Sequence, residues 1–61
     1  MQGLTIVEYI ADPDDKVSLT YSINGADRLV QVMKSNGWGI FTCRFNLFYG
    51  DSLEYTFIVN D

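Results

Sequence analysis

Apolar and polar residues alternate along the stretch from Trp38 to Tyr49, W-G-I-F-T-C-R-F-N-L-F-Y. One face of this stretch is apolar throughout and consists of Phe41, Cys43, Phe45, Leu47 and Tyr49. The other face is polar in the middle and apolar at both ends, and consists of Trp38, Ile40, Thr42, Arg44, Asn46 and Phe48. A period of two residues is typical of a β-strand with one face in a core. We therefore predict that this stretch forms the longest strand and lies at the centre of a sheet.

Four more segments have the composition of strands, because they are rich in β-branched and aromatic residues. They span residues 3–11, 16–23, 28–34 and 53–59. The first alternates imperfectly, since three aliphatic side chains share a face with Glu8, which suits an edge strand or a strand that crosses between two sheets. The third is short for a helix, and Val30 and Val32 favour a strand. No repeat or linker interrupts the chain, so we expect one domain over residues 1–61.

Turn residues separate these segments. Pro13 stands in an aspartate-rich link, and Asn24-Gly25 and Asn36-Gly37 are dipeptides that tolerate positive φ well. Links this short favour antiparallel pairing of sequential strands. The sequence therefore predicts an all-β fold of five antiparallel strands, either a curled meander or part of a sandwich.

The last segment is expected to pair with the central one. Its apolar face consists of Leu53, Tyr55, Phe57 and Val59. Because this face matches the Phe41 face, we predict that the two strands are neighbours in one sheet. Most aromatic side chains are accordingly expected in the core, namely Tyr21, Phe41, Phe45, Tyr49, Tyr55 and Phe57.

The chain is short for an independent domain. In 61 residues, the free energy gained by burying apolar surface roughly balances the free-energy cost of ordering the chain. The single cysteine, Cys43, excludes an intrachain disulfide and a cysteine-based zinc site, and the chain has no histidine. We therefore expect its apolar surface to be covered by other domains of a parent chain or by a second copy that completes the sheet.

Charge and hydropathy exclude two classes of partner. The net charge is −4, and the four basic residues are scattered, whereas nucleic-acid binding relies on clustered lysine and arginine. We expect no nucleic-acid partner. The longest apolar run is too short to span a bilayer, so we expect no membrane span, and the sequence leaves the compartment open.

The sequence shows no catalytic constellation. Without histidine, neither a Ser-His nor a Cys-His nucleophile can form within the chain. Asp12, Asp14 and Asp15 lack the spacing, the glycine and the closing glutamate of an EF-hand, so we expect a solvated turn there, with calcium as the alternative. Cys43 is flanked by apolar residues and is expected to be a buried structural thiol. We expect no enzymatic activity, no metal and no cofactor.

Two interpretations of Trp38 follow from the sequence, one structural and one functional. It follows a turn and lies on the mixed face of the central stretch. Because tryptophan is largely buried on average, we expect it to cap the end of the core. The alternative is an exposed ring that stacks on a sugar or anchors a protein contact. In that case the candidate ligand-binding residues are Trp38, Arg44, Asn46 and Thr42.

From Val17 onward the chain resembles the small immunoglobulin-like β-sandwich modules of large bacterial proteins, among them starch-type carbohydrate-binding modules. The residues that carry this resemblance are Tyr21, Asn24-Gly25, Met33, Gly39-Ile40-Phe41, Gly50 and the run from Leu53 to Phe57, L-E-Y-T-F. The pattern is also similar to the C-terminal end of long, uncharacterised proteins of gut Firmicutes. The resemblance implies a five-stranded antiparallel immunoglobulin-like sandwich or curled meander.

Together these features predict a non-catalytic accessory module that mediates packing or protein–protein contacts in a larger bacterial protein. The alternative is a carbohydrate-binding module that uses exposed aromatic residues, with a glycan as its partner.

Overall fold

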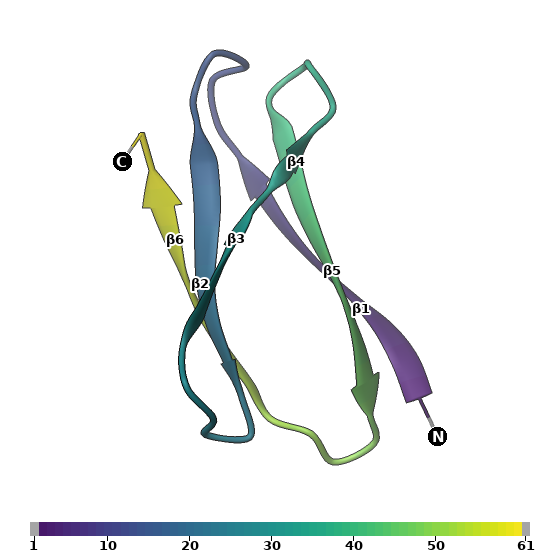
Figure 1. The fold of residues 1–61 in the computed structure, drawn as a ribbon. Helices are drawn as coiled ribbons and strands as arrows, with labels where there is room; N and C mark the ends of the chain where they lie inside the picture. Colours follow the sequence, from purple (N-terminus) through teal and green to yellow (C-terminus); the bar gives the residue numbers. More distant parts are fainter. Residues whose placement is uncertain (1, 61) are drawn as a thin grey trace.

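The computed structural model describes residues 2–60 and shows two antiparallel, three-stranded sheets (Figure 1). In chain order, the strands are β1 (Gln2–Ile10), β2 (Val17–Ile23), β3 (Leu29–Val32), β4 (Lys34–Ser35), β5 (Ile40–Phe48) and β6 (Leu53–Val59). The first sheet has the order β1-β5-β4 and the second has the order β3-β2-β6. This confirms the predicted all-β fold, with six strands in place of five. No helix in residues 2–60 is long and apolar enough to cross a membrane.

β5 lies at the centre of the first sheet, as its alternation predicts. It pairs with β1 over the whole length from Gln2 opposite Phe48 to Ile10 opposite Ile40, and with β4 on its other side. β1 has the same length as β5 and is an edge strand, as its imperfect alternation indicates. The two long strands therefore make up most of this sheet.

The two sheets pack face to face, and aromatic pairs show which strands oppose each other. Tyr9 of β1 meets Phe57 of β6 with ring centroids 4.5 Å apart. Tyr21 of β2 meets Phe45 of β5 with centroids 4.8 Å apart and the rings nearly edge to face. Such tilted arrangements are favoured by the charge distribution of the rings. β1 therefore lies over β6, and β5 lies over β2.

The pairing of sequential strands differs from the prediction at two links. β5 and β6 are not neighbours, because β5 pairs with β1 and β4 whereas β6 pairs with β2. β1 and β2 likewise belong to different sheets. The few residues of each link are enough to cross the roughly 10 Å between packed sheets. Apolar faces can meet across a sandwich as well as along a sheet, so the matched patterns of β5 and β6 did not distinguish these arrangements.

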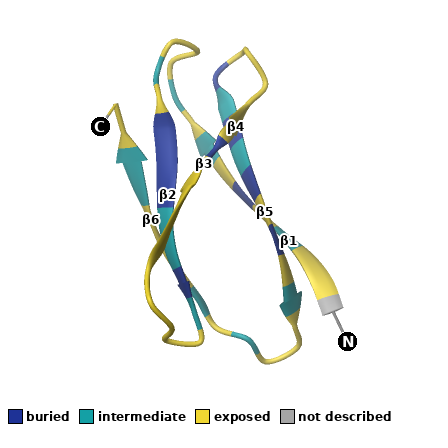
Figure 2. Cartoon of the chain, viewed as in Figure 1, coloured by how far each residue is buried: buried dark blue, intermediate teal, exposed yellow. Residues whose placement is uncertain are grey.

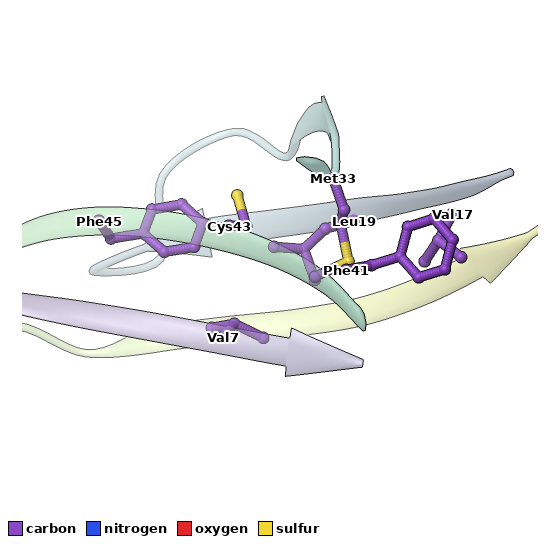
Figure 3. Packing of buried hydrophobic residues seen from close by; sticks show 7 residues of the cluster. All are labelled: Val7, Val17, Leu19, Met33, Phe41, Cys43 and Phe45. Atoms are coloured by element: carbon purple, nitrogen blue, oxygen red, sulfur yellow. The ribbon is translucent and has the colours of Figure 1, made fainter. Parts of the chain in front are cut away.

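The segment 28–34 forms two short strands instead of one. β3 pairs with β2 at the edge of the second sheet, and the chain then continues through Met33 into β4 at the edge of the first sheet (Figure 1). The Met33 N–H donates to the Val17 carbonyl oxygen at 3.0 Å. Figure 3 shows the Met33 side chain reaching from this bend toward Leu19 and Phe41. A buried methionine at the bend therefore connects the edges of the two sheets.

The core is small and lies between the first half of β2 and residues 41–45 of β5 (Figures 2 and 3). Its buried apolar side chains are Val7, Val17, Leu19, Met33, Phe41, Cys43 and Phe45. Tyr21 and Phe57 are half-buried and pack against this cluster, as predicted. Two predicted core residues are wrong: Tyr49 is 95% exposed and Tyr55 is 45% exposed. Tyr49 lies beyond the end of β5, and Tyr55 stands on an edge strand that the opposite sheet does not fully cover.

Both ends of the β2–β6 pair are closed by an asparagine in the left-handed conformation, with φ of 54° at Asn24 and 60° at Asn60. The Asn24 N–H donates to the Ser52 carbonyl oxygen, and the Ser52 N–H donates to Asn24 Oδ1, both at 2.8 Å. At the other end, the Asn60 N–H donates to the Lys16 carbonyl oxygen at 2.6 Å, and the Lys16 N–H donates to Asn60 Oδ1 at 2.8 Å. Asparagine suits these positions because it tolerates positive φ.

Candidate interaction surfaces

The four predicted ligand-binding residues are spread over the β4–β5 turn and the outer face of β5. Thr42, Arg44 and Asn46 lie on the outer face of β5, opposite the buried Phe41 face, as the alternation predicts. Trp38 lies in the β4–β5 turn before the strand begins. Arg44 and Asn46 stand four and six residues into β5, or about 13 and 20 Å from its start at the rise of a strand. A ligand the size of one sugar ring cannot contact Trp38 and the far end of this row together.

Trp38 does not cap the core, because 85% of its surface is exposed. The turn that holds it is organised by Asn36, whose Oδ1 accepts hydrogen bonds from the N–H groups of Trp38 at 2.7 Å and Ile40 at 3.1 Å. The buried position in this turn belongs to Gly39, whose carbonyl oxygen accepts from the Ala11 N–H at 2.9 Å. The turn geometry, which single-residue burial statistics do not capture, therefore directs the indole into solvent.

On the outer face of β1 between residues 4 and 10, three exposed side chains are aliphatic and the fourth is Glu8. Leu4, Ile6 and Ile10 are 51%, 55% and 75% exposed, and they stand opposite Asn46, Arg44 and Ile40 of β5. The exposed Phe48 lies at the end of the same face. We call Leu4, Ile6, Ile10 and Phe48 the aliphatic face. In the sequence its signal was the set of three aliphatic residues that share a face with Glu8, from which no site was predicted.

A shallow cleft of about 290 Å³ opens at the Phe48 end of the aliphatic face. It is formed where β1 begins and β5 ends, and it is lined by Gly3, Leu4, Thr5, Leu47, Phe48, Tyr49 and Asp51. Tyr49, which the sequence placed in the core, stands at this rim instead. Aromatic and aliphatic side chains thus continue the aliphatic face around the end of the sheet.

A second cleft, of about 320 Å³, lies where β3 and β4 diverge from β5. It is lined by Tyr21, Gln31, Val32, Lys34, Thr42, Cys43, Arg44 and Phe45. β4 pairs with β5 only at Phe41 and Thr42, so the edge of β5 beyond these residues borders the opening. We call this opening the β3–β5 cleft. It contains two of the predicted site residues, Thr42 and Arg44.

Cys43 contributes to the floor of the β3–β5 cleft and is buried, as predicted. Burial raises the pKa of its thiol, and the backbone N–H of Arg44 opposes this rise only in part. A raised pKa lowers the fraction of thiolate, which is the nucleophilic form. The structure therefore confirms that Cys43 is buried, and the raised pKa agrees with its interpretation as a structural thiol.

The aspartate-rich link forms a hydrogen-bonded turn, as predicted. The Asp15 N–H donates to the Asp12 carbonyl oxygen at 2.9 Å, and the Asp14 N–H donates to Asp12 Oδ1 at 2.9 Å. Asp15 Oδ1 accepts from the Asn60 side-chain amide at 2.9 Å. These carboxylates thus bind neighbouring backbone and amide groups. Within residues 2–60, no three potential ligands from histidine, cysteine, aspartate or glutamate gather in a group that could hold a metal.

Comparison with protein families connects the chain to a larger protein. The entire chain, residues 1–61, matches the model described as a family of unknown function, DUF5717, C-terminal. The chain belongs to this family. The match confirms the resemblance to a C-terminal module of uncharacterised proteins, and a small domain with that description indicates a larger parent chain. No curated protein and no solved structure matches the chain.

Proposed function

We propose that this chain is a non-catalytic accessory module that makes protein–protein contacts in a larger bacterial protein. The observation that carries this proposal is the aliphatic face, where Leu4, Ile6 and Ile10 are each more than half exposed. Contiguous exposed apolar side chains on a soluble domain mark surfaces that other proteins cover. The family description supports a larger parent chain, whose other domains are the partners that we expect to pack on the aliphatic face.

The shape of the domain supports the same conclusion. Its solvent-accessible surface is 4524 Å², whereas a folded monomer of 6.9 kDa has about 4000 Å² by the usual scaling. Its radius of gyration is 12.2 Å, compared with about 10.5 Å for a compact domain of this length. The domain is therefore more extended and more exposed than a self-sufficient one. Docking of its open face would remove this excess surface.

The immunoglobulin-like relationship implied by the resemblance stays a prediction. Two sheets packed face to face, with a chain that crosses between them, are the feature in its favour. It adds to the proposal the expectation that the module is one of several β-sandwich units in the parent protein.

The proposal is tested in a longer parent chain that contains this domain. We would replace Leu4, Ile6 and Ile10 by glutamine and compare the thermal midpoint of this domain in the longer chain with its midpoint as the isolated 61 residues. The matched control replaces Val30, which is 67% exposed on the outer face of the other sheet and does not line the β3–β5 cleft. We expect the triple variant to lose the stabilisation that the longer chain confers, while the control keeps it. Equal midpoints for the isolated and the attached wild-type domain would refute the proposal.

Glycan binding is the alternative, and the exposure of Trp38 is the observation in its favour. An exposed indole offers an apolar face on which a sugar ring can stack. Arg44 and Asn46 lie about 13 and 20 Å along β5 from its start, so Thr42 is the nearest of the polar partners that the sequence assigned to the ring. Titration with soluble α- and β-glucans tests this alternative, since a bound sugar would shift the emission of Trp38, the single tryptophan in the chain.

A further inference from the structure

The edge of β5 next to β4 is unpaired over part of its length. Asn36 N–H donates to the Ile40 carbonyl oxygen at 3.0 Å, and Lys34 stands opposite Thr42, so the backbone groups of these β5 residues point toward β4. In an antiparallel strand every second residue directs its N–H and C=O to the same side. The backbone groups of Arg44 and Asn46 therefore point to the same side, where β4 has already ended. Among residues 2–60, no strand pairs with them on that side.

This unpaired edge borders the β3–β5 cleft, which can receive side chains. Its lining includes the apolar or aromatic side chains of Tyr21, Val32, Cys43 and Phe45. A strand added beside β5 would direct alternate side chains into the cleft and the others toward the outer face of the sheet. The site therefore offers the two elements of strand addition, which are free backbone groups and a pocket for alternate side chains.

The charged residues that line this site are all positive. Lys34 and Arg44 both line the β3–β5 cleft, and they also line a smaller cleft of about 210 Å³ on the outer side of β4 and β5. No acidic residue lines either cleft. Glu8 lies diagonally across from Arg44 on β1, outside both clefts. Two of the four basic residues of a chain with a net charge of −4 thus stand together.

We propose that the β3–β5 cleft binds an extended acidic segment of another polypeptide, which pairs with β5 at Arg44 and Asn46. Its apolar side chains enter the cleft, and its alternate acidic side chains lie near Lys34 and Arg44. Charge complementarity at the rim selects the acidic partner. This inference rests on the proposed role in protein contacts but uses the side of β5 next to β4, whereas most of the aliphatic face lies on β1, on the other side of β5.

The outer edge of β1 is a longer unpaired edge, but it is a weaker candidate for this partner. It carries Glu8 near its C-terminal end, which would repel an acidic strand. The β5 edge at Arg44 and Asn46 instead presents the positive charges of Lys34 and Arg44, which attract an acidic strand.

The test uses the 61-residue chain and two synthetic probe peptides, one of alternating glutamate and valine and one of alternating lysine and valine. Backbone amide signals are followed by NMR during titration. We expect the glutamate peptide to bind, to shift the amides of Arg44 and Asn46, and to slow their hydrogen exchange. Added salt should weaken the binding, and the lysine peptide should not bind.

Variants on exposed residues separate charge from strand pairing. The double variant Lys34→Glu and Arg44→Glu should lower the affinity for the glutamate peptide by about tenfold or more and should favour the lysine peptide. The matched control is Arg28→Glu, since Arg28 is exposed and does not line the cleft. Asn46→Pro removes an N–H that points away from β1, so the fold should tolerate it while strand addition fails.

Several outcomes would overturn the inference. These are equal affinity for the two peptides, binding that leaves the Arg44 and Asn46 amides unchanged, and a dimer of the chain that Asn46→Pro dissociates, which would identify a second copy as the occupant. The glutamine variants of the aliphatic face should not change peptide binding, and the cleft variants should not change the stabilisation in the longer chain. Failure of either proposal is thus distinguishable from failure of the other.

Discussion

The side-chain amide of Asn24 donates a hydrogen bond to the Asp51 carboxylate at 2.9 Å, although 27 residues separate them. Asn24 closes the turn after β2, where Asn24 and Gly25 both have positive φ, as its Asn-Gly sequence predicts. Asp51 closes the turn after β5, since its other carboxylate oxygen accepts from the Phe48 N–H at 2.8 Å. One hydrogen bond therefore joins a turn of the second sheet to the turn that leaves the first sheet.

We expect Asn24 and Asp51 to be energetically coupled. Glycine also accepts positive φ, so Asn24→Gly preserves the backbone conformation but removes the side-chain amide. Asp51→Ala removes the carboxylate. Each single variant should lower the urea midpoint, and the double variant should lower it by less than the sum of the two. Additive losses would show that the contact contributes nothing beyond the two separate turns.

The same contact predicts a dependence of stability on pH. The Asn24 amide, together with the Phe48 N–H, lowers the pKa of Asp51 below its ordinary value of 3.8. A group whose pKa is lower in the folded state stabilises the fold above its unfolded pKa, and this stabilisation is lost as the pH falls through the folded pKa. Asp51→Asn should therefore be less stable than the wild type near neutral pH, and the difference should shrink below pH 3.8. Urea unfolding of both proteins from about pH 6 to about pH 2 checks the sign of this effect.

Gly39 should tolerate no side chain. Its φ is +97°, and an added Cβ would lie 2.5 Å from the carbonyl oxygen of Ala11. We expect Gly39→Ala to lower the free energy of unfolding by about 3 kcal/mol. Gly37→Ala is the matched control, because Gly37 has a φ of +86° but no atom within 4 Å of an added Cβ. Its loss should be only the conformational strain of about 1 kcal/mol, and losses of equal size in urea unfolding would contradict the predicted clash.

Trp38 and Phe41 should respond oppositely to truncation, although they are three residues apart. Trp38 is exposed and Phe41 is buried in the core. Trp38→Ala should change the free energy of unfolding by no more than about 0.5 kcal/mol. Phe41→Ala should lower it by about 3–5 kcal/mol, which can abolish folding in so small a domain.

Fluorescence supplies an independent measurement of Trp38. In the wild-type chain, its emission should resemble that of free tryptophan and should shift little on unfolding. Iodide should quench it readily. A blue-shifted emission that moves on unfolding would place the indole in a buried setting.

The strand pattern was predictable because side-chain alternation is a local property. The residues of β2 and β5 that the period of two assigned to the core are buried or half-buried, and Asn24-Gly25 forms the predicted hairpin turn. Cys43 was also predicted correctly, because both of its neighbours on the same face are aromatic. In each case the evidence lies within a few residues of the position.

The candidate surfaces were predictable only in part. Thr42 and Arg44 share the outer face of β5 as expected, yet their place beside a cleft depends on β3 and β4, because the chain pairs with β2 in β3 and pairs with β5 only after Met33, in β4. Trp38 was misplaced because its exposure depends on hydrogen bonds to Asn36 and on the approach of Ala11 to Gly39. Such contacts join segments far apart in the chain.

The sequence by itself determined which segments are strands, which face of β2 and β5 is apolar and where the chain turns, because these depend on side-chain period and on the conformational preferences of asparagine, glycine and proline. The tertiary structure decided that β6 pairs with β2, that β4 stops after two residues and that Leu4, Ile6 and Ile10 face solvent. An apolar face can be covered by a neighbour in its own sheet, by the opposite sheet or by another protein. The pattern of a single strand is the same in all three cases, so the choice among them is made only when the strands pack together.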